Sequence, residues 1–231
     1  MATPMAVPKS KPSPTRGSSG DQCVAMSGVG WHGYEAALRV RGDQSRPRLI
    51  YLDGDVFFVS PSDAHERMNL RIGTILHEII LGLRIPCHRT GQTTFRRESR
   101  RGGVEGDQTY YFANEARVRG KRRIDLNIDP PPDLAVEVVH THDADAALEV
   151  YGRLGVPEVW VCTEENLVIL ARQPDGEYQA IESSLSLPFL TRKEIFERAR
   201  QPEDLPELEW MEGIRRWVLD ELVPRVRGRA G

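Results

Sequence analysis

The chain has 231 residues, of which 39% are hydrophobic and 28% charged, and its formal net charge is −3 at pH 7. These values are typical of a globular protein with a real core, and no apolar stretch approaches the ~20 residues that a membrane-spanning helix needs. The N-terminal segment has no apolar run long enough for a signal peptide, so we expect a cytoplasmic protein. Its three cysteines form no CxxC pair, which argues against a disulfide framework and against a cysteine-rich zinc site.

The first part of the chain, residues 1–22, is rich in Pro, Ser, Lys and Gly and is expected to be a flexible tail. The apolar pattern that follows predicts helices and strands in alternation. In chain order we expect a helix at 30–42, a hairpin at 48–60, a long helix at 62–85, strands near 85–97, 107–113 and 133–140, a helix at 143–155, strands at 156–163, 166–173 and up to 181, and helices at 191–200 and 210–226. This order predicts an α/β domain over 23–200, with a mixed central β-sheet flanked by helices, and a helical extension over 201–231.

Turn and cap residues mark several of these boundaries. The Asp-Gly pair at 53–54 is a strong hairpin signal. Asp63 is the expected N-cap of the long helix, and Glu66 follows three residues later, as in a capping box. We expect Asp143 to begin the helix that Gly155 ends.

Three acidic residues stand where an acid needs an explanation. Glu137 interrupts the apolar run 134–139, and a buried carboxylate is costly unless something pairs with it. Asp107 opens the apolar run 107–112, directly after the turn-like sequence RGGVEG, and Glu66 lies in the first turn of the long helix. A helix cap explains Glu66 and a turn explains Asp107 equally well, whereas nothing local in the sequence satisfies Glu137.

Acids that begin or interrupt adjacent strands converge at one end of a sheet. Two or three such carboxylates are suitable ligands for Mg²⁺, which also retains waters and binds substrate phosphates. A metal placed in this way activates water for attack on a phosphodiester. Two basic stretches, 95–103 and 116–123, flank the Asp107 position, and they are either solvated loops or a rim that contacts phosphates.

Four segments in order, YLDGDVFFVSPSDAHE, GVEGDQTYYF, RGKRRIDLNIDPPPDLAVEVV and YGRLGVPEVWV, resemble the Uma-type restriction endonucleases of the PD-(D/E)XK nuclease superfamily. The resemblance covers residues 29–200 approximately. It implies a restriction-endonuclease-like fold and hydrolysis of DNA with Mg²⁺, for which Mn²⁺ is a substitute. By position, Asp107 and Glu137 match the two strand acids that hold the metal, and Glu66 matches the helix acid that completes the site. Gly106 replaces the proline that usually precedes the first of these acids.

The sequence departs from the family at the lysine. The superfamily pattern places a lysine two residues after Glu137, where this chain has Val139. Uma-type proteins often place it instead four residues before the tyrosine of the Y…GVPE motif. That tyrosine is Tyr151, and the residue four positions earlier is Ala147. Both positions therefore lack the charge.

Several residues are candidates for the missing function. Lys121 in the second basic stretch and His140, just after the strand, are our candidates for catalytic roles. Arg153 can only stabilise charge, because a guanidinium is not a base. His140 and His142 are equally well explained as surface residues at a strand end. A zinc site that combines them with the Cys-His pair at 87–88 is a weaker alternative.

Two functions stay open at this point. One is a metal-dependent DNA endonuclease, and the other is a nuclease-fold protein with weak or no catalysis that binds nucleic acid or a protein partner. A third reading, an α/β domain with structural acids, explains each acid singly but not their arrangement. A homodimer would suit the cleavage of both strands of a duplex. The apolar side of 210–222 supplies either a dimer face or part of the chain's own core.

Overall fold

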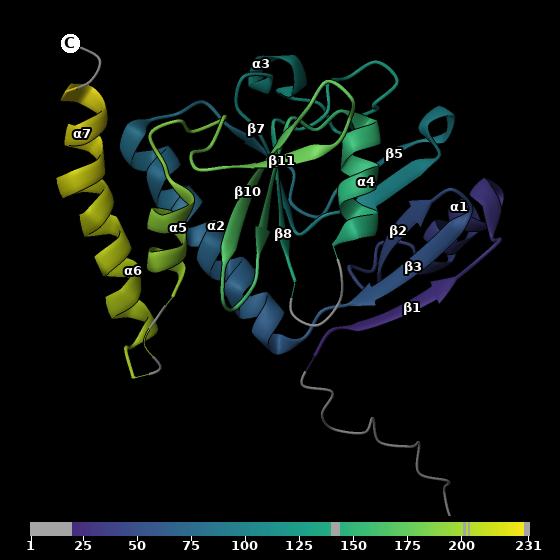
Figure 1. Cartoon of the computed structure of the whole chain (residues 1–231), viewed down its shortest axis with the longest axis horizontal. Coiled ribbons are helices and arrows are strands. Elements are labelled where there is room, and N and C mark those ends of the chain that lie inside the picture. The colour runs from purple at the N-terminus through teal and green to yellow at the C-terminus, as the bar shows by residue number, and fades with distance from the viewer. Residues whose placement is uncertain (1–19, 140–143, 201, 203, 229–231) are drawn as a thin grey trace, which may run out of the picture.

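The computed structural model describes residues 20–139, 144–200, 202 and 204–228, so most of the expected tail lies outside the described residues. Helices and strands alternate along the chain (Figure 1). In order they are β1 (Gln22–Met26), α1 (Gly30–Arg41), β2 (Arg48–Leu52), β3 (Asp55–Ser60), α2 (Asp63–Leu83), β4 (His88–Arg89), β5 (Thr94–Arg97), the short helix η1 (Glu98–Arg100), β6 (Gly102–Glu105), β7 (Gln108–Tyr111), α3 (Glu115–Val118), β8 (Leu134–Val138), α4 (Asp145–Leu154), β9 (Glu158–Cys162), β10 (Leu167–Arg172), β11 (Tyr178–Ile181), α5 (Arg192–Ala199), α6 (Glu207–Arg216), the π-helical segment η2 (Trp217–Leu222) and α7 (Val223–Gly228).

The strands form two sheets. A five-stranded antiparallel sheet has the order β1-β3-β2-β6-β5, and a six-stranded sheet has the order β11-β10-β9-β8-β7-β4. The six-stranded sheet is mixed, because β8 and β9 are parallel and joined through α4 while its other pairs are antiparallel. The predicted α/β class with a mixed sheet flanked by helices is confirmed, and the hairpin β2–β3 belongs to the second, separate sheet.

One face of the six-stranded sheet packs against α2, α5 and the C-terminal helices (Figure 1). Ile72, Ile75 and Ile79 of α2 are fully buried there against Val136 and Trp160. The other face packs against α4, and its core also includes residues of β5 and β6. A third cluster, under α1, is built from aromatic and aliphatic residues of β2 and β3.

The C-terminal helices belong to the main core. The apolar side that the sequence left open as a dimer face is at most 5% exposed and joins the cluster under α2; it comprises Trp210, Ile214, Trp217, Val218 and Leu222. This side is therefore intramolecular. A homodimer stays a proposal, and it would need a different surface.

Several boundaries differ from the prediction. Ser62, and not Asp63, caps α2, because the Ser62 side chain accepts the backbone N–H of His65. Helix α4 begins at Asp145 after Ala144, while the expected cap Asp143 lies outside the described residues. The predicted turn at 101–106 contains strand β6, and β1 is a strand in the segment just after the expected tail.

In the described part of the chain, no helix has the length and apolar character that crossing a bilayer requires. The cytoplasmic location stays a prediction.

The junction between the two sheets positions the acids. Strand β6 ends at Glu105 in one sheet and β7 begins at Gln108 in the other, so the Gly106-Asp107 link crosses between them. Gln108 pairs with Val136 in the antiparallel register of β7 and β8, and this register puts Asp107 next to Glu137.

Candidate active site

Asp107 and Glu137 form a buried pair of carboxylates at this junction. They are only 2% and 9% exposed. The backbone N–H of Val138 donates to Asp107 Oδ2 at 2.7 Å, which fixes the Asp107 carboxylate beside β8. The structure thus brings together the two acids that the sequence singled out most strongly.

Asp107 has two basic partners that the sequence analysis missed. Its Oδ1 accepts from the guanidinium of Arg48 on β2 and lies 2.8 Å from Nε2 of His65 on α2. The side chains of Arg48 and His65 are 5% and 1% exposed, so both contacts lie away from solvent. A buried charge is tolerated when it is paired in this way.

His65 lies between two acids. Its Nδ1 is 3.1 Å from Asp21 Oδ2, and its Nε2 faces Asp107. Burial lowers the pKa of His65, but the hydrogen bond to Asp107 and the charges of both acids outweigh burial and raise it. Nε2 is also 2.9 Å from Arg48 Nη2. Once protonated, this nitrogen donates to Asp107 and does not accept from Arg48.

A third buried acid, Glu105 at the end of β6, is fully accounted for by its neighbours. It forms an ion pair with Arg41 of α1, which donates to Oε2 at 3.1 Å, and it accepts the backbone N–H of Leu49 at 2.9 Å. The hydroxyl of Thr94 donates to its other oxygen. Glu105 therefore ties α1 to three strands of the five-stranded sheet.

Glu137 differs from these acids because its direct partner is neutral. The hydroxyl of Tyr151 on α4 donates to Glu137 Oε1 inside the protein. Desolvation and then the charge of Asp107 raise the pKa of Glu137 from its ordinary 4.5 to about 8, against the opposing effects of Arg48, Tyr151 and His65. Among the acids of this site, only Glu137 lacks a cationic partner of its own within the described residues.

Gly106 explains how Tyr151 reaches Glu137. A Cβ atom at position 106 would collide with Tyr151 Oη and would lie 2.9 Å from Glu137 Oε1. A proline at this position, as the family pattern has it, is therefore incompatible with this arrangement of Tyr151. The departure at Gly106 and the Tyr151–Glu137 hydrogen bond belong together.

Glu66 lies at the rim of the site. Its Oε1 accepts from Arg46 at 2.6 Å, and its side chain is 26% exposed. It makes no capping box, because α2 is capped by Ser62. Burial lowers the pKa of Arg48, whereas Asp107, Glu137 and, more weakly, Glu66 raise it. The structure does not place Glu66 in contact with the two central acids.

The proposed replacements for lysine lie elsewhere. Lys121 forms an ion pair with Asp129, and it lines a different pocket from the one beside Glu137. Arg153 is paired with Asp53 at 2.5 Å and also with Glu149. His140 and His142, for which roles were predicted, lie outside the described residues.

A small cavity of about 20 Å³ lies beside Glu137. Val139 and Ala147, the two positions that lack the lysine, both line it. Arg48 and His65 line it as well. The basic groups at this site are therefore supplied from β2 and α2, and they line the same cavity as both positions.

The described residues contain no group of three or more His, Cys, Asp or Glu side chains arranged to hold a metal ion. The donors of Asp107 and Glu137 still fit Mg²⁺, which is commonly held by one or two carboxylates together with waters and a phosphate. They do not fit zinc, for which nitrogen and sulfur ligands are typical. Cys87 and His88, half of the zinc alternative, lie at β4, and the other half falls outside the described residues.

The roles of Arg48, His65 and Glu105 depend on contacts between residues far apart in the sequence, so the sequence did not predict them. Arg48 and Asp107 are 59 residues apart, and His65 and Asp107 are 42 apart. One signal was available, because Arg48 directly precedes the apolar run of the first hairpin strand. The position alone does not tell a buried arginine from one that flanks a strand in solvent.

Three comparisons bear on the family. No curated protein matches this sequence. A solved structure from Anabaena variabilis ATCC 29413, described as a "putative nuclease belonging to DUF820", is similar at 12% identity with a TM-score of 0.49, and the match covers 67% of this chain and 92% of that chain. The family model Uma2, described as "Putative restriction endonuclease", matches residues 31–206, which is well over half of the chain. The chain therefore belongs to the Uma2 family, and the resemblance found in the sequence is confirmed.

Proposed function

We propose that this chain is a metal-dependent endonuclease that hydrolyses phosphodiester bonds in DNA, with Mg²⁺ as its cofactor and Mn²⁺ as a substitute. The observation that carries the proposal is the buried carboxylate of Glu137, which sits next to Asp107 and is held by a neutral hydroxyl. Once Glu137 is ionised, the two adjacent buried carboxylates need positive charge beyond that of Arg48. A divalent cation bound by both would supply that charge.

The surrounding residues hold the two carboxylates in place. The Val138 N–H orients Asp107, and the Tyr151 hydroxyl orients Glu137. Glu66, at the rim, would act through water once released from Arg46. A bound Mg²⁺ supplies Lewis-acid stabilisation and a water of lowered pKa.

In this proposal, Arg48 takes the electrostatic part of the missing lysine. Its guanidinium is fixed by Asp107 and faces the cavity next to Glu137. One preorganised donor of this kind is worth about 10²–10³ in rate when it faces charge that develops in the transition state. Arg48 cannot remove a proton from water. For that step His140 stays our candidate, and Lys121 would first have to leave Asp129.

Nicking of supercoiled plasmid by the purified full chain tests the proposal. The assay is run in Mg²⁺, in Mn²⁺ and in EDTA, with Asp107→Asn and Glu137→Gln beside wild type. Asp220→Asn and Glu212→Gln, both at exposed positions of the C-terminal helices, are matched controls for the same chemical changes. We expect metal-dependent nicking that both site variants abolish and both controls retain. Nicking that survives in either site variant would contradict the proposal.

The second candidate is a nuclease-fold protein that binds nucleic acid with little or no catalysis. The absence of a lysine at Val139 and Ala147, together with the Arg48–Asp107 ion pair, favours it. A chain that binds DNA tightly but nicks it in neither metal would establish this alternative.

A further inference from the structure

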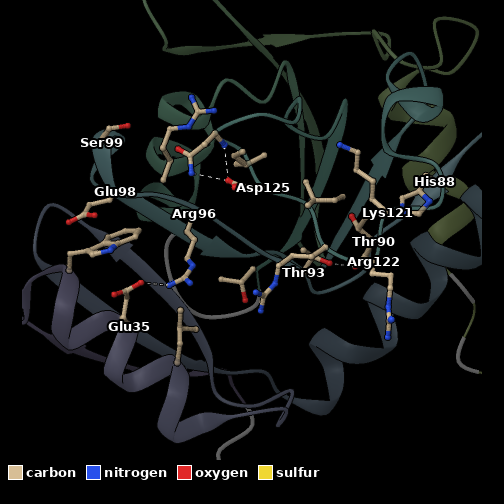
Figure 2. A pocket seen from close by; sticks show the side chains of 18 of the residues that line it. Glu35, His88, Thr90, Thr93, Arg96, Glu98, Ser99, Lys121, Arg122 and Asp125 are labelled. Carbon is tan, nitrogen blue, oxygen red and sulfur yellow. Dashed lines mark hydrogen bonds and ion pairs between the residues drawn. The ribbon is translucent and has the colours of Figure 1, made fainter.

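A wide pocket of the described residues lies away from the buried acids. It has a volume of about 940 Å³ and is bounded by α1, by β4 and β5, and by the segment 121–127 (Figure 2). Six basic side chains line it, against three acidic ones; the basic residues are Arg89, Arg96, Arg97, Lys121, Arg122 and Arg123. The whole chain carries −3, so positive charge is concentrated in this groove. The two basic stretches found in the sequence meet here.

Three of these arginines are available to a ligand. Arg122 and Arg123 are exposed and make no hydrogen bond or ion pair within the described part of the chain. Arg97 is half-buried and lines the pocket, and its guanidinium likewise makes no hydrogen bond or ion pair among the described residues. Arg96 and Lys121, by contrast, are already paired with Glu35 and Asp129.

Hydroxyl groups also line the pocket, together with His88 and the acid Glu98. In Figure 2, Thr90 and His88 lie near Lys121 and Arg122, and Glu98 and Ser99 lie at the other end of the pocket. Hydroxyl groups and arginines together are the usual protein donors to phosphate oxygens. The one Trp, Tyr or Phe in the lining is Trp31, which is half-buried. It is covered by Arg96 at 5.9 Å and packed on Tyr51, so the groove offers charge and not a stacking platform.

The groove leads towards the acids. A neighbouring pocket of about 330 Å³ shares Thr90 and Thr93 with the groove. The same pocket shares Arg48 and Glu105 with the cavity beside Glu137. The groove, this pocket and the cavity beside Glu137 are therefore neighbours that share lining residues.

We propose that this groove binds the sugar–phosphate backbone of one nucleic-acid strand, on one side of the phosphodiester that lies at Asp107 and Glu137. Arg97, Arg122 and Arg123 are its phosphate contacts. The position of the cleaved bond rests on the proposed function, whereas binding in the groove does not. Because the contacts are to phosphates, affinity falls with salt and depends little on base sequence.

The test measures binding without cleavage. Fluorescence anisotropy in EDTA gives the affinity of the full chain for labelled single-stranded and duplex DNA of equal length, over about 50 to 200 mM salt. The variant is Arg122→Gln with Arg123→Gln. The control is Arg215→Gln with Arg216→Gln, which removes the same charge from α6, at the end of the molecule opposite α1 and β5 (Figure 1).

We expect the groove variant to bind DNA at least about tenfold more weakly at low salt. The slope of log K against log salt should also shrink, by about 1.8 for a duplex or about 1.4 for a single strand, because two phosphate contacts are lost. Whichever form of DNA, single-stranded or duplex, shows this loss of affinity is the form that the groove binds. The control keeps wild-type affinity and slope. Equal losses in both variants, or none in the groove variant, would overturn the inference. Groove-dependent binding in a chain that never nicks plasmid would refute the proposed function and leave the groove standing.

Discussion

Replacing Arg48 by methionine tests the electrostatics of the site most sharply. Arg48→Met keeps the length and apolar stem of the side chain but removes the guanidinium that Asp107 contacts, so that only His65 is left as a basic partner. The side chains of Arg48 and Asp107 are 5% and 0% exposed, so water cannot replace the lost partner. Removing one member of a buried ion pair typically costs about 3–5 kcal/mol. Domains of this kind unfold with about 5–15 kcal/mol, so much of the stability would be lost.

Urea denaturation at neutral pH measures this cost. The double variant Arg48→Met with Asp107→Asn separates charge from packing, because the amide oxygen of asparagine still accepts the Val138 N–H. We expect the double variant to be more stable than Arg48→Met alone. In Arg48→Met, Asp107 and Glu137 should also bind a divalent cation more tightly, because Arg48 no longer competes for Asp107. Added Mg²⁺ should therefore stabilise this variant more than wild type.

The reasoning would be refuted by an Arg48→Met protein that loses less than about 1 kcal/mol, the range of solvent-exposed pairs. It would also be refuted if the two substitutions simply added, since residues in direct contact should couple.

Three further predictions concern Glu137 and its neighbours. Because the pKa of Glu137 is raised from 4.5 to about 8, the folded chain holds a proton between these pH values that the unfolded chain has lost. The free energy of unfolding should therefore fall as the pH rises through this window. In a pH series of urea titrations, Glu137→Gln should remove that part of the slope, and an unchanged slope would count against the raised pKa. Tyr151→Phe leaves Glu137 Oε1 without its donor and should cost about 1–3 kcal/mol in the same assay, whereas a neutral effect would mean that the hydrogen bond contributes nothing. Gly106→Ala should cost about 1–3 kcal/mol through the collision with Tyr151 Oη, and Tyr151→Phe should relieve part of it; additive costs would argue against the collision.

The sequence predicted most elements because their signals are local. Helix α2 has its apolar spacing, the β2–β3 hairpin has Asp53 and Gly54 at positive φ, and Gly155 ends α4 with φ 85°. Each of these features depends on a few neighbouring residues and can be recognised without knowledge of the fold.

Strand β6 was missed because its glycines resemble a turn. Gly102 and Gly103 are there for close packing, since a Cβ at 102 would lie 3.2 Å from Val150 and one at 103 would collide with Tyr34. The neighbours that demand glycine come from α4 and α1, so only the tertiary structure reveals the reason. Single-residue shifts, such as the cap at Ser62 instead of Asp63, arise because adjacent polar residues offer equivalent caps.

The candidate site likewise contains residues that the sequence predicted and residues that only the tertiary structure shows. Asp107 and Glu137 stood out because each is an acid at the edge or inside an apolar run, and the register of β7 and β8 joins them. Arg48 and His65 approach from β2 and α2, and no spacing in the sequence links these elements to β8. The basic partners of Asp107 in the described residues therefore come from elements that no pattern around Glu137 indicates.

Calorimetric titration of Mn²⁺ into the full chain tests the central claim, a divalent cation shared by Asp107 and Glu137, most directly. Run near neutral pH in two buffers of different ionisation enthalpy, the titration also counts protons released on binding. The account predicts one site that is lost in Asp107→Asn and in Glu137→Gln and kept in Glu212→Gln, with a proton released from Glu137 because its pKa is about 8. No binding by wild type, or binding that Glu137→Gln leaves unchanged, would contradict it.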